Sequence, residues 1–178
     1  MKETPCPASC CEQRCDTVKL TRRDLVAATG LGVSGTLLQQ VYAAPSGPQD
    51  KAYPSLKIAD LDSLKPDVPV AFNYPDETSP AVLIRLRAAA LGGVGPGNSV
   101  VAFSQLCTHK GCPVSYRPER KLMICPCHWS TFDPAKSGQM VIGQASQALP
   151  QIQLRVQGNA IYAEGVTGLI FGRHTNML

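Results

Sequence analysis

Two short segments that carry cysteine and histidine place the strongest constraint on the fold of this chain. They read CTHKGC at residues 107–112 and CPCHWS at residues 125–130. Each supplies one cysteine and, after it, one histidine. Each also has one further cysteine, which follows the histidine in the first segment and precedes it in the second. Paired thiolates and imidazoles are typical metal ligands, so the fold has to bring two loops together around one metal site. The four candidate ligands are Cys107, His109, Cys125 and His128.

This ligand set suits two kinds of metal site. Zinc accepts two sulfur and two nitrogen ligands in a tetrahedral arrangement, which would make the chain a zinc-stabilised binding module without redox function. A [2Fe-2S] cluster can instead place both cysteines on one iron and both histidines on the other. One cysteine and one histidine from each loop would let each loop contact both irons, with the histidines nearer to solvent.

A twin-arginine export signal is predicted over residues 1–44. Arg22 and Arg23 precede a weakly apolar stretch at 25–38, and small residues follow it, which is the order found in such signals. The stretch is shorter than the roughly 20 residues that a membrane-spanning helix needs. We therefore expect cleavage near residue 44, a periplasmic location, export in the folded state and no stable membrane anchor. No role is assigned to four cysteines in this segment, Cys6, Cys10, Cys11 and Cys15.

Cys112 and Cys127, the remaining cysteines of the two ligand segments, favour the iron–sulfur interpretation. A zinc site that already has two cysteine and two histidine ligands would not need these two additional cysteines. In an exported protein they are expected to form a disulfide. Such a bond would join the two loops across the metal site and shield it.

The rest of the chain predicts an all-β domain. After a linker at 45–54, short apolar or alternating runs recur between turn residues, and no long helical period appears. This spacing is typical of an antiparallel sandwich or barrel, and Gly158-Asn159 is expected at the tip of a hairpin. The predicted strands are 56–59, 68–73, 81–87, 99–104, 122–124, 151–156, 160–163 and 168–172.

Charge and composition exclude one class of function. The net charge is +4, and no basic stripe with interleaved aromatic residues is present, so nucleic-acid binding is not expected. Charged residues make up only 17% of the chain, against roughly 25% in average proteins. This low value fits either a surface partly covered by a partner or a small β-rich domain.

Together, CTHKGC and CPCHWS resemble the ligand loops of the Rieske iron–sulfur protein family. The resemblance implies one [2Fe-2S] cluster per chain, with Cys107 and Cys125 on the inner iron and His109 and His128 on the outer iron. It also implies stacked antiparallel sheets with a small cluster-binding subdomain over residues 55–178. The additional cysteine pair is similar to that of the exported, respiratory members.

The same resemblance indicates residues around the cluster. Ser130 matches a serine that donates a hydrogen bond to a cluster sulfide in the quinol-oxidising members. Phe132 stands where those members have a tyrosine that donates to a ligand cysteine. Because a phenyl ring cannot donate, a lower reduction potential is expected. The stretch GQAS, which includes Gly143 and Gln144, replaces their proline-rich loop.

Further stretches resemble the small subunits of arsenite oxidases, namely GGVGPG, VAFSQLCTHKGCPVSY, CPCHWSTFD, GQMVIGQAS and GLIFGR. The resemblance implies a heterodimer in which a molybdenum-containing large subunit oxidises arsenite to arsenate. This chain would accept single electrons from it and pass them to a soluble acceptor such as cytochrome c or azurin. No catalytic residue is expected on this chain. The alternative within the family is the Rieske subunit of a quinol–cytochrome c oxidoreductase.

Overall fold

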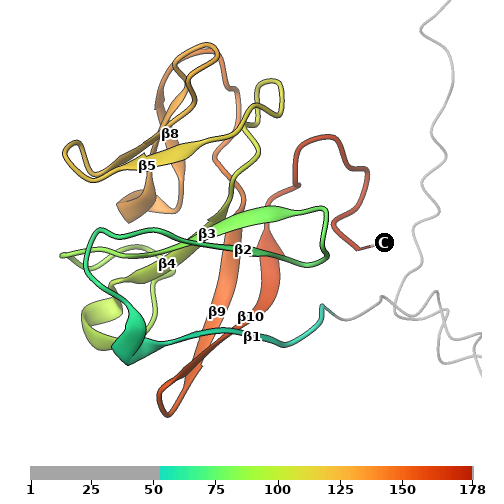
Figure 1. The fold of residues 1–178 in the computed structure, drawn as a ribbon. Helices are drawn as coiled ribbons and strands as arrows, with labels where there is room; N and C mark the ends of the chain where they lie inside the picture. Colours follow the sequence, from blue (N-terminus) through green and yellow to red (C-terminus); the bar gives the residue numbers. More distant parts are fainter. Residues whose placement is uncertain (1–52, 178) are drawn as a thin grey trace, which may run out of the picture. The chain divides into compact units, whose positions relative to one another are not determined.

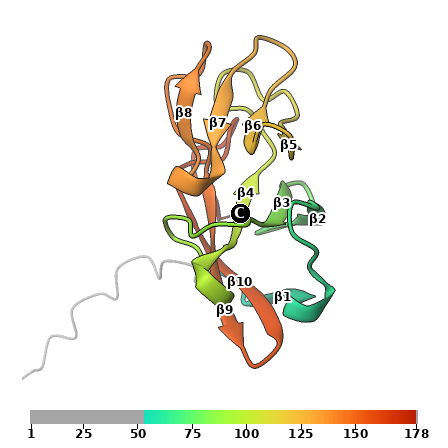
Figure 2. The same cartoon turned by 90° about the vertical axis from the view of Figure 1, so that its left-hand side faces the viewer.

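The computed structural model describes residues 53–177, which form ten strands in two antiparallel sheets (Figures 1 and 2). The predicted export signal lies outside the described residues, as does nearly all of the linker. The base sheet has the strand order β1 (Leu56–Asp60), β10 (Ala160–Thr167), β9 (Gln151–Gln157), β4 (Val100–Ser104), β3 (Pro80–Arg85) and β2 (Val70–Asn73). The small sheet consists of β5 (Ser115–Arg117), β6 (Leu122–Ile124), β7 (Thr131–Asp133) and β8 (Gln139–Ile142).

The helical content of this part of the chain is confined to three 3-10 turns. They are η1 (Leu61–Ser63), η2 (Pro96–Asn98) and η3 (Pro134–Lys136). None of the described helices has the length and hydrophobicity that a membrane span requires. The all-β prediction is therefore confirmed for residues 53–177.

Strands β3 and β4 form a centre of the base sheet that is covered on both faces. Their segments AVLI and VVAF are continuous apolar runs, which are typical of strands buried on both sides, and all eight side chains are at most 2% exposed. Because side chains alternate along a strand, the two faces serve two hydrophobic cores. Val82, Ile84, Val101 and Phe103 pack with the small sheet, and Ala81, Leu83, Val100 and Ala102 pack with β9 and β10.

The small sheet belongs to one excursion of the chain, residues 105–149, which we call the insert. It leaves the base sheet after β4 and returns at β9, and these two strands are hydrogen-bonded neighbours. The amide of Ser104 donates to the carbonyl of Pro150 at 2.9 Å, so the insert starts and ends at adjacent points. Figures 1 and 2 show the small sheet as a separate unit above the base sheet.

Strand prediction succeeds for the longer strands and for the three-residue β6, and it fails for the other short or irregular segments. The hairpin at Gly158-Asn159 is confirmed, since Gln157 pairs with Ala160 across it. Strands β5, β7 and β8 are missed by the sequence analysis. The predicted strand at 168–172 is wrong, because the side chain of Asn176 takes the place of a partner strand there. It accepts from the amide of Ile170 at 2.8 Å and donates to the carbonyl of Gly168 at 2.7 Å.

The carboxyl-terminal segment is fixed to the base sheet by an ion pair. The Arg173 guanidinium donates to both carboxylate oxygens of Asp76, at 2.6 and 2.9 Å, and also to Thr78. These bonds hold the pKa of the Asp76 carboxyl well below its usual range. The segment also contacts the insert, because Phe171 lies against Gly111, where an added Cβ would be 2.6 Å from the phenyl ring.

Replacing Asp76 by asparagine is expected to destabilise the protein at pH 7 by about 1–2 kcal/mol, the range for a hydrogen bond to a charged group at a partly exposed site. The folded-state pKa of Asp76 is lowered, so its ionisation contributes fully above the unfolded value of about 3.9. That contribution disappears as the pH falls below about 4. Thermal melts between pH 3 and 7 should therefore show the wild-type and variant curves converging in acid. Asp62→Asn, at an exposed carboxylate, is the control and should follow the wild type at every pH; a constant gap for Asp76→Asn would contradict the ion-pair interpretation.

Candidate metal centre

Three loops converge at one end of the small sheet, as the strand register requires. Ser115 at the start of β5 pairs with Ile124 at the end of β6, which brings together the first loop (107–112) and the second loop (125–130). Thr131 at the start of β7 pairs with Ile142 at the end of β8, which adds the third loop (143–146). The two predicted ligand segments are thus neighbours in the structure, and the GQAS stretch is beside them.

The first and second loops share one backbone conformation. In each, the first residue donates its amide to the carbonyl of the sixth, and the fifth donates its amide to the carbonyl of the first. The donor–acceptor pairs are Cys107–Cys112 (2.9 Å), Gly111–Cys107 (2.7 Å), Cys125–Ser130 (2.9 Å) and Trp129–Cys125 (3.1 Å). These bonds hold two matching turns, each of which presents its first cysteine from the same position.

Cys107 and Cys125 are free thiols, and each residue is only 1% exposed. Burial raises the pKa of the Cys107 thiol, and the adjacent Cys125 raises it further. Hydrogen bonds from the His109 amide and the Ser130 hydroxyl oppose this rise. Two buried thiols side by side form a pair of sulfur ligands whose thiolate charge a metal would stabilise.

His109 and His128 lie next to each other, with ring centroids 4.7 Å apart and ring planes at 84°. The Nδ1 atom of His109 is buried and has no hydrogen-bond partner among the described residues. A buried polar atom without a partner costs about 1–3 kcal/mol. Coordination to a metal would remove that cost. The residues present therefore fit a metal centre with two sulfur and two nitrogen ligands.

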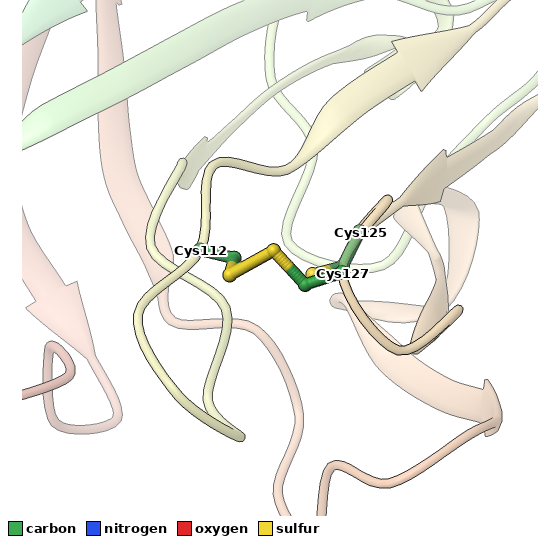
Figure 3. Close-up of side chains that lie close together, drawn as sticks. All are labelled: Cys112, Cys125 and Cys127. Carbon is green, nitrogen blue, oxygen red and sulfur yellow. A yellow bond between two sulfur atoms is a disulfide. The ribbon is translucent and has the colours of Figure 1, made fainter.

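Cys112 and Cys127 form a disulfide that joins the first loop to the second (Figure 3). Their Cα atoms are 6.5 Å apart. Both disulfide sulfurs lie within 4.8 Å of the Cys125 sulfur and of each other, so proximity alone would group these three cysteines. Disulfide sulfurs carry no thiolate charge, however, and only Cys125 of the three is available as a ligand.

Ser130 is held by the third loop. Its hydroxyl oxygen is fully buried and accepts the backbone amides of Gln144 and Ala145, at 3.2 and 3.0 Å. Because the Ser130 oxygen accepts both amides, its hydroxyl hydrogen remains available to donate toward Cys107. Gln144 therefore contributes through its backbone, while its side chain is exposed.

Gly143 allows the third loop to approach this closely. Its φ is +119°, and an added Cβ would lie 2.4 Å from the Ser130 Cα and 2.8 Å from the Ser130 nitrogen. Two further contacts are not predicted from the sequence. They are the Ala145 amide on Ser130 and a hydrogen bond from the Thr108 hydroxyl to the Gln147 carbonyl at 2.9 Å, which ties the first loop to the chain after the third.

Phe132 lies in β7 and is fully buried in the core that contains both free cysteines. It pairs with Met123 of β6 and with Met140 of β8. Its surroundings are apolar, and they include the two free cysteines of the same core.

Comparison with known proteins identifies this centre. Residues 55–153 match the family described as Rieske [2Fe-2S] domain. The chain belongs to the Rieske family. It binds one [2Fe-2S] cluster, and the zinc-module interpretation is thereby overturned.

Among curated proteins, the chain is similar to two iodate reductase subunits. It is 40% identical over 160 residues to iodate reductase subunit IdrB of Denitromonas iodatirespirans, a match that covers 88% of this chain and 86% of that protein. It is 43% identical over 123 residues to IdrB of Pseudomonas sp. (strain SCT), with 67% and 64% covered.

A solved Rieske structure has the same fold. It is the soluble domain of the Rieske protein II (soxF) from Sulfolobus acidocaldarius, with a TM-score of 0.60 and 23% sequence identity. The match covers 68% of this chain and 82% of that one.

Proposed function

We propose that this protein is the electron-transfer subunit of a molybdenum-containing oxidoreductase that acts on an oxyanion. The observation that carries the proposal is the 40% identity to an iodate reductase subunit over 86% of that subunit's length. Among residues 53–177, the one group of His, Cys, Asp or Glu side chains at metal-binding distances is Cys112, Cys125 and Cys127 of the ligand loops, two of which form the disulfide. Substrate chemistry is therefore assigned to a partner subunit.

We assign the cluster ligands from the arrangement of the loops. Cys107 and Cys125, which are buried, would hold the inner iron. His109 and His128 would hold the outer iron nearer to solvent, where His128 is exposed. A bound cluster of this type supplies one-electron transfer.

The chain's own residues set the conditions for that transfer. The disulfide keeps the two ligand loops together, and Ser130 presents a hydroxyl donor to the cysteine side. Hydrogen bonds to cluster sulfurs favour the reduced state.

Iodate is the first substrate candidate for the complex, because its reductase subunits match most of this chain. Arsenite is the second, on the strength of the motif resemblance to arsenite oxidase small subunits. Either reaction transfers more than one electron per oxyanion. We therefore place the multi-electron step on a molybdenum-containing large subunit, with this chain as a one-electron relay. The relay would take electrons from a soluble donor during iodate reduction and pass them to a soluble acceptor such as cytochrome c or azurin during arsenite oxidation. The quinol–cytochrome c alternative is less well supported, since GQAS replaces the proline-rich loop.

Assays of the purified complex test the proposal. The full chain should co-purify with a molybdenum-containing large subunit. Iodate reduction is followed with reduced viologen, and arsenite oxidation with an oxidised dye. Iodate turnover supports the first candidate, and arsenite turnover supports the second. Co-purification with a membrane cytochrome b, without molybdenum, would overturn the proposal in favour of the quinol-oxidising alternative.

We further propose that residues 1–44 direct export of the folded protein to the periplasm. Replacing Arg22 and Arg23 together by lysine should stop export almost completely, because the twin-arginine pathway reads the arginine pair itself. Fractionation followed by immunoblotting measures the effect: the mature protein should be lost from the periplasm, and the uncleaved precursor should accumulate in the cytoplasm. The control is Lys19→Arg, which changes a nearby basic residue outside the pair. Undiminished periplasmic protein in the Arg22→Lys/Arg23→Lys variant would contradict this route.

Phe132→Tyr is expected to raise the midpoint potential of the cluster. By the resemblance to the quinol-oxidising members, the new hydroxyl would donate to a ligand cysteine and stabilise the reduced state. A hydrogen bond of about 1–2 kcal/mol corresponds to about 40–90 mV for a one-electron couple. Redox titration followed by electron paramagnetic resonance measures the shift. Phe103→Tyr, at another fully buried phenylalanine of the same core, is the control for general core disturbance, and an equal shift there would count against a specific bond.

A further inference from the structure

Charge is distributed unevenly between the insert and the rest of the described chain. Residues 53–104 and 150–177 contain six lysines and arginines and six carboxylates. The insert contains five basic residues, Lys110, Arg117, Arg120, Lys121 and Lys136, against two carboxylates, Glu119 and Asp133. Lys136 pairs with Asp133 at 3.9 Å. The other four are exposed and have no carboxylate partner among residues 53–177.

Two of these cations line a cavity beside the second loop. The cavity has a volume of about 250 Å³ and lies between the β5–β6 turn and the loop. It is lined by Arg117, Glu119, Arg120, Ile124, Pro126 and Trp129. Guanidinium groups next to apolar side chains suit an incoming carboxylate, because arginine binds carboxylates in a bidentate manner and also packs on aromatic faces.

Trp129 occupies a backbone position that disfavours any residue except glycine. The first and second loops have matching hydrogen bonds, and the fifth residue of each is left-handed. In the first loop this residue is Gly111 (φ +72°), and in the second it is Trp129 (φ +61°). A side chain in this conformation costs roughly 1–2 kcal/mol.

Packing does little to offset that cost. The Trp129 side chain is 69% exposed, the highest value among the large apolar residues that the structure describes. Tryptophan and arginine are enriched among the residues that dominate binding energy at protein interfaces. An exposed indole held at a strained position beside free arginines is therefore better explained by recognition than by folding.

We propose that Trp129, Arg117 and Arg120 form the docking site for the soluble redox partner, and that this partner presents an acidic face. The inference rests on the electron-transfer function proposed above. Charge complementarity selects the occupant, because transient electron-transfer complexes are small and are steered by opposite charge. The cavity borders Pro126, which follows Cys125, and Trp129, which follows His128. A protein seated there would therefore lie beside two of the residues that would hold the cluster.

The surface formed by the carboxyl-terminal segment next to the first loop has a different character. Leu169 and Phe171 are 44% and 37% exposed, and Phe171 contacts the first loop at Gly111. Permanent interfaces are more apolar than transient ones. This contrast assigns the basic side to the transient partner.

An anionic membrane would also attract lysine, arginine and tryptophan, but a concave site lined in part by Glu119 fits a protruding acidic side chain better than a flat lipid surface.

Binding measurements with the full, cluster-loaded chain test the proposal. The probe is a c-type cytochrome of strongly negative net charge, and surface plasmon resonance gives the affinity. At low salt, Arg117→Gln/Arg120→Gln should weaken binding roughly tenfold. The matched control, Lys57→Gln/Lys65→Gln, removes two charges from exposed lysines of the base-sheet region and should change affinity less than twofold. High salt should abolish the difference, because exposed charges are then screened.

Trp129→Gly separates recognition from folding. The variant should melt at the same temperature as wild type or higher, since glycine suits the left-handed position, and it should bind the acidic cytochrome roughly tenfold more weakly. Wild-type affinity for Trp129→Gly would overturn the proposal, as would equal losses for the arginine and lysine variants. Arginine-dependent binding to phosphatidylglycerol vesicles, without binding to the cytochrome, would assign the surface to lipid instead. A purified chain without a Rieske resonance signal would contradict the proposed electron-transfer function itself. A chain that shows the signal but does not bind the cytochrome would contradict only the docking proposal.

Discussion

Cys107→Ser is expected to yield protein without a [2Fe-2S] cluster. Cys107 is a buried free thiol adjacent to Cys125, and a serine hydroxyl does not replace a thiolate as a ligand for iron. Iron and acid-labile sulfide should fall from one cluster per chain to near zero, and the resonance signal of the reduced cluster should disappear. Metal analysis and spectroscopy of the purified full chain measure both effects.

The disulfide cysteines provide the matched comparison. Cys112 and Cys127 lie as close to Cys125 as a shared metal would require, yet they are bonded to each other. Cys112→Ser/Cys127→Ser should therefore retain the cluster as purified and lose about 3 kcal/mol of stability, the value expected for a closed loop of roughly 15 residues. Loss of iron from Cys107→Ser with retention in the double variant supports the assignment of roles. The reverse pattern would overturn it.

Gly143→Ala is expected to lower the melting temperature by roughly 10 °C, which corresponds to about 2–4 kcal/mol for a domain of this size. The added methyl group would lie 2.4 Å from the Ser130 Cα, at a φ of +119°. The third loop then has to move away, and its two amides no longer hold the Ser130 hydroxyl. The midpoint potential should fall along with the melting temperature.

A second glycine separates the two causes of this effect. Gly158 also has a left-handed φ, +60°, but an added Cβ there meets nothing within 4 Å. Gly158→Ala should therefore show only the conformational cost, about 1 kcal/mol, and an unchanged potential. If both variants lost the same stability and kept the same potential, the close approach of the third loop to Ser130 would have no functional consequence.

The ligand loops are predictable from the sequence because their chemistry is local. A cysteine and a histidine within six residues, repeated after a short interval, indicate a metal site before any fold is known. The contacts that tune the site are not local. The Gly143–Ser130 approach and the Ala145 amide depend on the pairing of β7 with β8, and β7 has only three residues. The sequence analysis predicts no strand at 131–133 or at 139–142, so it could not place this pairing.

In the fold, too, features set by local sequence are predictable, and features set by contacts between distant residues are not. The continuous runs in β3 and β4 predict strands buried on both faces, and the β9–β10 hairpin follows from its turn residues. The segment at 168–172 has strand-like composition, but its backbone groups bond to Asn176. The left-handed conformation of Trp129 is likewise hidden in the sequence, because only the matching bonds of the two loops relate it to Gly111.

The connection of the insert to β4 and β9 has a consequence for how such proteins diversify. Both junctions lie on hydrogen-bonded neighbours, and one backbone bond, from Ser104 to Pro150, spans them. A segment of different length or partner preference can thus be grafted between the same two strands while the platform beneath it keeps its register. Chimeras that exchange residues 105–149 between homologues would carry over cofactor tuning and docking specificity together, as one transferable module.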